Sequence, residues 1–516
     1  MADTGRTRKR SPFAYPPLKE IRLCYAVVVG TIGYAWWCVF QISQQYKFQI
    51  GDLGSVVRLP IVGERFKDES NWEWFRWSPM AYSALPLYFL SSLFFNIGSS
   101  FLPETLFVSL YTLLSIAICS YQFTPILVFY VILQGTFIFI AQSLSPRRTT
   151  VWLASLPILY FVMNQTDHLH SDVFLVLLFV SYTLLSFISF ALETVNGPLR
   201  PEESSLAKRY LRMMFYSFYH PYLVSLIVLY PDFERQISKR KKRARDWSST
   251  LLFGLRVGFW WGVCELVLHF CYFESILRNL HYSASLPKDT FVALGMALGQ
   301  FFHVKYVVIF GLPSFFAKLD NMQPLDGPMC MARVCLYSKV WRSFDRGLYN
   351  FFKKYIFIPI CEPSFSLPRK IIGVFISYGF VLIWHGFYKH NIVWILLNIS
   401  ALFMEMTSKA IYSIDGVREW REKRMSDVNL RRFLGLLQII PFAFGLYSNF
   451  YFLGGAELGG LYVDRVLVEE TLPVRPFFLV LITLGYFYTQ TCMEVERLME
   501  LKELSAENTK KTKKVE

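Results

Sequence analysis

Long apolar stretches, separated by short polar breaks, run through most of this chain. A helix of about 20 predominantly apolar residues crosses the hydrocarbon core of a bilayer, and most of these stretches approach or exceed that length. The pattern therefore predicts an all-α polytopic membrane protein with about 10–12 transmembrane helices. The predicted spans cover residues 21–43, 81–98, 102–120, 122–142, 151–165, 171–193, 250–273, 289–316, 371–388, 391–412, 433–455 and 473–494.

Two further apolar stretches, Met213–Tyr230 and Leu348–Ile360, do not fit as ordinary spans. The first contains His220-Pro221 and returns to a basic segment that must lie on the side from which it started. The second is short and carries two lysines. Irregular backbone is tolerated at membrane depth where protein buries it, so we predict re-entrant or interfacial segments in both places.

The formal net charge of +15 is concentrated in a few short basic segments. Short basic loops beside spans indicate the cytosolic side of a membrane, which explains these segments better than nucleic-acid binding does. Both termini are then cytosolic. The predicted divisions are a basic cytosolic arm at 1–20, a membrane domain at 21–494 with a luminal loop at 44–79 and a cytosolic, partly re-entrant region at 317–370, and a cytosolic lysine-rich tail at 495–516.

The composition agrees with a membrane protein. With 54% hydrophobic, 18% aromatic and 18% charged residues, a chain of 516 residues is too apolar for a soluble protein of this size. Its nine cysteines show neither paired zinc spacing nor the density of a disulfide framework. No small-residue cleavage site follows the first apolar stretch, which we expect to be retained as a signal anchor.

Several ionisable residues lie inside apolar stretches, where they are costly and either pair within the bundle or face a cavity. Glu265 and His269 are four positions apart on one predicted helix face, and His303 lies close to Lys305. Pairing within the bundle and a functional role are both open for these residues. The tryptophan-rich segment Asn71–Trp77 is expected to lie in the aromatic belt at the membrane interface.

The most informative stretch is 341–405. A polar cluster containing Asp345 precedes a predicted span that carries His385 at its end. A histidine can take a proton from an attacking nucleophile near neutral pH, as acyl transfer from a thioester to a hydroxyl or an amine requires. A hydrogen bond between helices is the alternative explanation for His385. The predicted topology places Asp345 toward the cytosol and His385 toward the lumen, so the two residues could flank one tunnel.

The motif Trp341-Arg-Ser-Phe-Asp345-Arg-Gly347 is followed by Trp384-His385-Gly386. These two motifs are the core of a resemblance to the membrane-bound O-acyltransferase (MBOAT) superfamily, and specifically to its hedgehog acyltransferase branch. Together the matching blocks cover most of residues 65–465. The other blocks, in the same order as in the family, are Asn71–Trp77, Trp260–Glu265 with His269, Val304–Gly311 through Asp320, Asn398 with Glu405, and Ser448–Gly455.

The resemblance implies an MBOAT-like bundle with re-entrant segments around a central tunnel, with His385 and Asp345 as its catalytic residues. No cofactor is required for the transfer itself, because acyl-CoA is the co-substrate, but haem b with Cys330 as its iron ligand is implied. One block departs from the family, since Val224-Ser-Leu-Ile227 replaces a His-Asn-Gly-Pro-like block and leaves the acyl acceptor open. Substrate binding is expected at Trp341, Arg342, Arg346, Trp384, Asn398 and Asn449.

The expected function is transfer of a long-chain acyl group, palmitoyl, from acyl-CoA to the N-terminal cysteine of a secreted hedgehog-like protein in the endoplasmic reticulum lumen. The anionic head of the donor would lie near Arg342, Arg346, Lys353 and Lys354. Expected partners are acyl-CoA, a secreted protein acceptor and membrane lipids, with no nucleic acid. One alternative is an MBOAT enzyme that acylates a protein serine or a lipid hydroxyl. The other is a membrane transporter, against which the lack of two corresponding halves argues.

The carboxyl end bears on localisation. Lys513 and Lys514 stand fourth and third from the end of the predicted cytosolic tail. This arrangement resembles a dilysine signal for retrieval to the endoplasmic reticulum, and a solvated basic tail is the alternative. We therefore expect a multi-pass protein of the endoplasmic reticulum membrane, with the Golgi as a second compartment.

Overall fold

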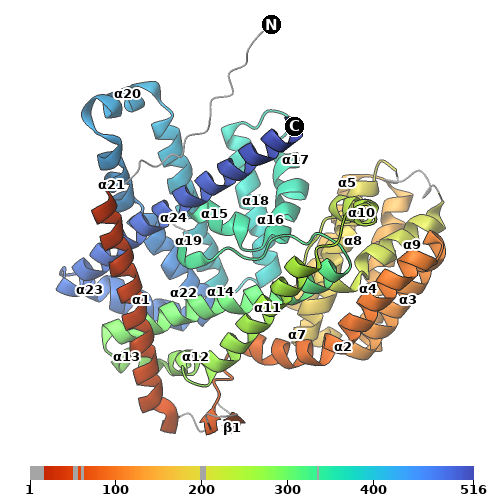
Figure 1. Cartoon of the computed structure of the whole chain (residues 1–516), viewed down its shortest axis with the longest axis horizontal. Coiled ribbons are helices and arrows are strands. Elements are labelled where there is room, and N and C mark those ends of the chain that lie inside the picture. The colour runs from red at the N-terminus through yellow and green to blue at the C-terminus, as the bar shows by residue number, and fades with distance from the viewer. Residues whose placement is uncertain (1–16, 50–55, 60–62, 198–204, 334–335, 516) are drawn as a thin grey trace.

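A computed structural model describes residues 17–49, 56–59, 63–197, 205–333 and 336–515. Within these residues the protein is a bundle of helices with one small hairpin, in which β1 (Val56–Leu59) pairs antiparallel with β2 (Gly63–Phe66) (Figure 1). Eleven helices of the described part are long and apolar enough to cross a membrane. The protein is thus an all-α polytopic membrane protein, as the hydrophobic pattern predicts.

Helices α2 to α10 form the right-hand part of the bundle in Figure 1. Helix α1 (Leu18–Tyr46) is separate from them and packs against α14 and α24. The elements of this part are α2 (Trp72–Phe101), α3 (Glu104–Gln122), α4 (Pro125–Leu144), α5 (Arg148–Asn164), α6 (Thr166–Leu169), α7 (Val173–Leu175), α8 (Ser181–Thr194), α9 (Leu206–Ser217) and α10 (Tyr230–Arg240).

The following helices form the centre and the left-hand part of Figure 1. Helix α14 packs against α1, α2, α11 and α22, and α19 packs along α22. The elements are α11 (Trp247–Leu268), α12 (Phe273–Arg278), α13 (Leu280–Ser285), α14 (Lys288–Leu319), α15 (Tyr337–Ser343), α16 (Arg346–Phe352), α17 (Ile358–Cys361), α18 (Leu367–His385), α19 (Lys389–Tyr412), α20 (Asp415–Arg424), α21 (Asp427–Leu437), α22 (Ile439–Tyr462), α23 (Glu469–Thr471) and α24 (Pro476–Val515).

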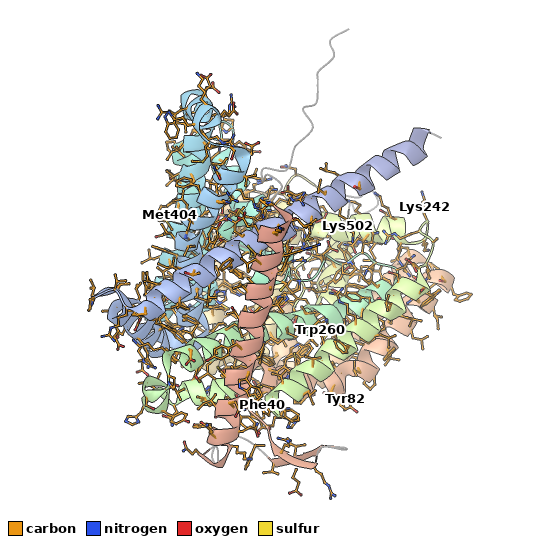
Figure 2. The ribbon with its side chains drawn as sticks, turned by 60° about the vertical axis from the view of Figure 1, so that its left-hand side comes forward. Phe40, Tyr82, Lys242, Trp260, Met404 and Lys502 are labelled. Atoms are coloured by element: carbon orange, nitrogen blue, oxygen red, sulfur yellow. The ribbon has the colours of Figure 1, made fainter. Side chains whose placement is uncertain are left out.

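Large apolar side chains project from the outer faces of the long helices. Tyr82 on α2 and Leu255 on α11 are each 72% exposed, and Figure 2 shows Tyr82 directed away from the bundle. Soluble monomers rarely expose contiguous apolar patches larger than a few hundred Å². A lipid environment removes that penalty, so these faces are the ones that contact acyl chains of the membrane.

The backbone between α9 and α10 is irregular and buried, as predicted for Met213–Tyr230. After a 3₁₀ turn at His220–Tyr222, the chain reaches α10 without regular structure. Buried backbone polar groups need hydrogen-bond partners, and here side chains of α3, α8 and α9 supply them. The bonds run from the Ser115 hydroxyl to the Phe218 carbonyl (2.5 Å), from the Tyr216 hydroxyl to the Val228 carbonyl (2.6 Å), from the His220 N–H to the Tyr111 hydroxyl (3.2 Å) and from the Tyr230 N–H to the Ser189 hydroxyl (3.0 Å).

The structure corrects the predicted aromatic belt. Helix α2 begins at Trp72, so the loop predicted at 44–79 ends earlier and the tryptophan-rich segment is helical. Trp74 and Trp77 are 1% and 4% exposed and stack on each other inside the protein. The Trp74 indole N–H donates to the Glu265 carboxylate (2.9 Å), which draws that ring inward. Only Trp72, which is 46% exposed, retains an exposed surface suited to the interface.

The last helix extends beyond the predicted final span. Helix α24 runs without interruption from Pro476 to Val515, so most of the lysine-rich tail predicted at 495–516 continues the last span as a helix. Residues 1–16 of the predicted basic arm lie outside the described residues. Figure 1 places the start of α1, the end of α24 and α20 at one end of the molecule and the β-hairpin at the other.

Candidate active site

His385 is the last residue of α18 and lies at the sharp turn into α19. Gly386 has a φ of +86°, and a Cβ at this position would lie 2.6 Å from the Tyr388 ring, so the turn requires glycine. The Asn391 side-chain amide donates to the carbonyl oxygens of His385 (2.6 Å) and Gly386 (3.0 Å). The backbone that carries the histidine is therefore fixed.

The imidazole of His385 lies against two aromatic rings. Its ring centroid is 5.2 Å from that of Trp394 and 5.2 Å from that of Phe452, both in edge-to-face geometry. Trp394 belongs to α19 and Phe452 to α22, and the two rings stack at 4.3 Å. These contacts place the histidine in the core of the bundle, where water has limited access.

Asp345 caps the amino end of α16. Its carboxylate accepts a hydrogen bond from the Leu348 N–H (2.8 Å), which is the ordinary chemistry of an N-cap aspartate. Burial raises the pKa of Asp345 to about 6, and the hydrogen bonds from the Leu348 and Gly347 N–H groups oppose that shift. The carboxylate is ionised at neutral pH and gains protons in mildly acidic solution.

One turn of α14 links the two predicted catalytic residues. The Phe302 ring lies 5.2 Å from Phe344, the neighbour of Asp345, and 6.0 Å from Phe452, which packs on His385. In the described part of the chain, no hydrogen bond joins the Asp345 and His385 side chains. The packed rings of Phe344, Phe302 and Phe452 form an aromatic wall, and Asp345 and His385 lie at two parts of it, not in a catalytic dyad.

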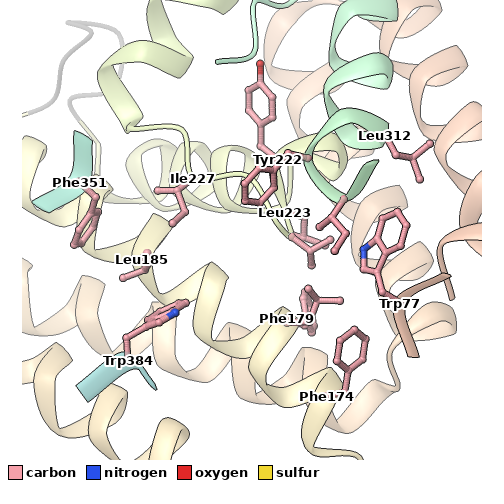
Figure 3. Close-up of a cluster of buried hydrophobic side chains, with 14 of the residues drawn as sticks. Trp77, Phe174, Phe179, Leu185, Tyr222, Leu223, Ile227, Leu312, Phe351 and Trp384 are labelled. Atoms are coloured by element: carbon pink, nitrogen blue, oxygen red, sulfur yellow. The ribbon is translucent and has the colours of Figure 1, made fainter. Parts of the chain in front are cut away.

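A small pocket of about 20 Å³ opens beside Asp345. It is lined by residues 225–228, 325–327 and 344–347, together with Phe310. A Cβ on Gly347 would lie 2.2 Å from the carbonyl oxygen of Ile227, so only glycine allows this approach. The block that departs from the family pattern therefore forms part of the pocket wall, and Figure 3 shows Ile227 in the same buried cluster as Phe351 and Trp384.

The predicted substrate-binding residues on α15, α18, α19 and α22 have different surroundings. Trp341 and Asn398 bind each other, with the indole N–H 2.8 Å from the Asn398 side-chain oxygen. Trp384 is 8% exposed and packs edge-on against Tyr182. Asn449 lies half-buried on α22, three residues from Phe452 and thus on the face of that helix directed at His385.

The basic residues expected around the donor head are not equivalent. Arg342 is exposed and donates to the Ser338 carbonyl (2.9 Å). Arg346 lines the pocket, and its Nε is buried with no hydrogen-bond partner among the residues that the structure describes. Lys353 is exposed, whereas Lys354 forms an ion pair with Glu193 (2.6 Å). Arg346 is therefore the cation best placed to meet a ligand in the pocket.

The ionisable residues noted inside the spans mostly pair within the bundle. Lys305 is buried and forms an ion pair with Glu73 (2.6 Å), while Glu265 pairs with Lys67 (2.6 Å). His269 contacts the Phe66 carbonyl oxygen through its Nδ1 (3.2 Å). Pairing, left open by the sequence, is thus observed for Lys305 and Glu265.

Sequence reasoning missed Glu73 and Tyr306 as neighbours of the site. The Tyr306 hydroxyl donates to Glu73 (2.7 Å), and its ring lies 5.3 Å from Phe344. The Tyr306 ring also lies 5.0 Å from Phe302, which packs on Phe452 beside His385. Glu73 stands within the tryptophan-rich block, where an acidic residue among aromatic ones at the start of an apolar stretch was the available signal.

Comparisons with known proteins identify the family of the chain. Residues 137–448 match the model of the MBOAT, membrane-bound O-acyltransferase family. The protein-cysteine N-palmitoyltransferase HHAT of Mus musculus is 24% identical over 466 residues, which cover 87% of this chain and 93% of the mouse protein. The protein-cysteine N-palmitoyltransferase Rasp of Drosophila melanogaster is 26% identical over 310 residues, 60% of this chain and 61% of the fly protein. The chain belongs to the membrane-bound O-acyltransferase family, and these relatives place it in the hedgehog acyltransferase branch.

Proposed function

We propose that this MBOAT acyltransferase moves a palmitoyl group from palmitoyl-CoA to the amine of an N-terminal cysteine on a secreted, hedgehog-like protein. The observation that carries the proposal is the fixed, half-buried His385 at one part of an aromatic wall, with Asp345 and a pocket at another part. The names of the HHAT and Rasp relatives support the acyl group and the acceptor residue.

The chemistry assigns one proton transfer to His385. The acceptor nitrogen attacks the thioester carbonyl carbon, His385 takes the proton that the nitrogen loses, and the bond between that carbon and the CoA sulfur breaks. The departing thiolate takes up a proton, which regenerates the neutral histidine. Asp345 and Arg346 belong to the donor side, where Arg346 meets an anionic group of CoA and Asp345 positions the donor.

The charged residues at the two ends of the molecule indicate which end faces the cytosol. Lys242 and Lys502 lie toward one end in Figure 2, and Phe40 lies toward the other. The positive-inside rule makes the basic end cytosolic, so the hairpin end is luminal and both termini are cytosolic. Acyl-CoA then arrives from the cytosol and the acceptor from the lumen of the endoplasmic reticulum.

Haem b is the proposed resident cofactor, and the residues at Cys330 suit it chemically. Cys330 is half-buried, and the Nε of Arg333, three residues on, is buried without a hydrogen-bond partner. A thiolate is an established ligand of haem iron, and an arginine can pair with a propionate. Within the described residues no cluster of three or more His, Cys, Asp or Glu side chains forms a metal site. Loss of the haem absorption band on Cys330→Ala would support the assignment, and an unchanged band would exclude it.

The proposed reaction is tested with purified protein, labelled palmitoyl-CoA and three peptides that begin with cysteine, alanine or N-acetylcysteine. We expect a stable amide on the cysteine peptide and at least about a hundredfold slower transfer by His385→Ala, since general base catalysis contributes 10²–10⁴-fold. Equal acylation of the acetylated peptide would assign the product to the sulfur or to a hydroxyl instead of the amine. Unchanged transfer by His385→Ala would exclude the histidine.

A further inference from the structure

The carboxylate of Glu73 has capacity for another ligand. One oxygen lies 2.6 Å from the Lys305 ammonium and the other accepts from the Tyr306 hydroxyl at 2.7 Å. An ionised carboxylate offers about four acceptor positions, so these two partners leave positions free. The side chain is 30% exposed, while that of Lys305 is 5% exposed. The carboxylate is therefore the more exposed member of this ion pair.

A second acidic residue provides a comparison. Glu265 also pairs with a lysine at 2.6 Å and is 31% exposed. It additionally accepts from the Trp74 indole N–H and the Ser78 hydroxyl, each at 2.9 Å. Among the described residues, Glu265 thus has three partners and holds helices together, whereas Glu73 has two and keeps free acceptor positions.

Glu73 also lies close to both parts of the active site. The Tyr306 hydroxyl donates to Glu73, and the Tyr306 ring lies 5.3 Å from Phe344, the neighbour of Asp345. The same ring lies 5.0 Å from Phe302, which packs on Phe452 beside His385. Within the Glu73–Lys305 ion pair the carboxylate is the more exposed partner, so a ligand that reaches this pair meets an acceptor suited to a cation.

The position of Glu73 indicates the end of the molecule from which a ligand reaches it. It lies in the first turn of α2, just after the segment that follows the hairpin. That segment is anchored by Asp68, whose carboxylate accepts from the Glu274 and Ser275 N–H groups at 3.2 and 3.1 Å. Glu73 is thus fixed at the hairpin end of the molecule, the end from which a luminal acceptor would arrive.

We propose that Glu73 is an acceptor-binding residue whose free carboxylate positions receive the α-ammonium group of the incoming polypeptide. This inference rests on the proposed function of the site and names the group that recognises its second substrate. The ammonium binds as a cation and loses one proton to solvent before His385 serves the attack. Lys305 and Tyr306 hold the carboxylate in place for this contact.

The test measures binding, so that it does not depend on turnover. The probe is a ten-residue peptide of cysteine followed by glycines and serines, labelled at its carboxyl end, and the reference is the same peptide with an acetylated amine. Fluorescence polarisation gives both affinities for the wild type, Glu73→Gln, Glu265→Gln and the double variant Glu73→Gln with Lys305→Met. The double variant removes both charges, so it keeps the test informative if Glu73→Gln alone fails to fold.

We expect the wild type and Glu265→Gln to bind the free amine at least about tenfold more tightly than the acetylated peptide, the size expected of one charge-assisted hydrogen bond. Glu73→Gln and the double variant should lose that preference, with the Michaelis constant for palmitoyl-CoA unchanged. A preference retained in either variant, or absent from the wild type, would overturn the inference. Absence of amide product in the transfer assay concerns the proposed function and is a separate result.

Discussion

Replacing Asp345 with asparagine should abolish transfer and yet stabilise the protein. Asparagine has nearly the same shape and still accepts the Leu348 N–H as an N-cap. It lacks the negative charge that burial disfavours, which is the cause of the raised pKa of Asp345. Catalysis and stability therefore change in opposite directions at this position.

The magnitude follows from the pKa. A carboxyl that titrates at about 6 instead of 3.8 is less stable in its ionised form by about 3 kcal/mol at neutral pH. Because the Asp345 side chain is partly exposed, water screens the charge. We take about half of this value, ~1.5 kcal/mol, as the expected gain of Asp345→Asn at pH 8.

The pH dependence has a definite sign. The folded protein binds the proton more tightly than the unfolded chain does, so the cost of Asp345 is fully present above the folded pKa of about 6 and disappears as the pH falls through the unfolded value of 3.8. At pH 5 the gain from Asp345→Asn should fall to roughly half of its value at pH 8.

The assay is thermal unfolding of purified protein in detergent at pH 8 and pH 5, with Asp415→Asn as the control. Asp415 is 78% exposed, so its substitution should leave the unfolding temperature unchanged at both values of pH. An Asp345→Asn protein that is less stable than the wild type at pH 8, or equally stabilised at both values of pH, would refute the reasoning.

Three further variants test other contacts. Gly347→Ala places a Cβ 2.2 Å from the Ile227 carbonyl oxygen, so it should lower the free energy of unfolding by about 1–3 kcal/mol and raise the Michaelis constant for palmitoyl-CoA. Unchanged stability would show that the backbone at Ile227 moves to accommodate the methyl group. Asn391→Ala removes both hydrogen bonds at the His385 turn and should lower kcat with a smaller effect on substrate affinity, which steady-state kinetics would detect. Arg431→Met breaks a buried ion pair with Glu494 (3.1 Å) and should destabilise the protein by about 3 kcal/mol, while an unchanged unfolding temperature would contradict that value.

The spans could be predicted from sequence because lipid imposes a length and an apolar composition on each helix. The structure confirms the all-α polytopic fold and the buried irregular backbone near His220. His385 could be singled out because ionisable groups are costly inside apolar stretches, and Asp345 because it lies in the polar cluster just before that stretch. Their placement on a shared aromatic wall could not be predicted, since Phe302 lies about forty residues before Asp345 and only packing brings it there.

The sequence pattern failed where a residue type has two common environments. Tryptophans occur at membrane interfaces and in protein cores, and only a partner such as Glu265 decides that Trp74 is buried. Glu73 was overlooked because its partners come from α14, more than two hundred residues away. The lysine-rich end of α24 reads as a tail by charge, although it continues the helix of the preceding span.

The irregular segment between α9 and α10 has a consequence for how the chain assembles. Its carbonyl and N–H groups depend on hydroxyl groups of Ser115, Ser189 and Tyr216, which stand on three different helices. Helices satisfy their own backbone and can enter the bilayer singly, but this segment has no stable form there until those helices are together. It is therefore among the last parts of the core to form, and the pocket wall at residues 225–228 forms with it. A polypeptide released before α3, α8 and α9 have met would lack the pocket beside Asp345 even with every span inserted.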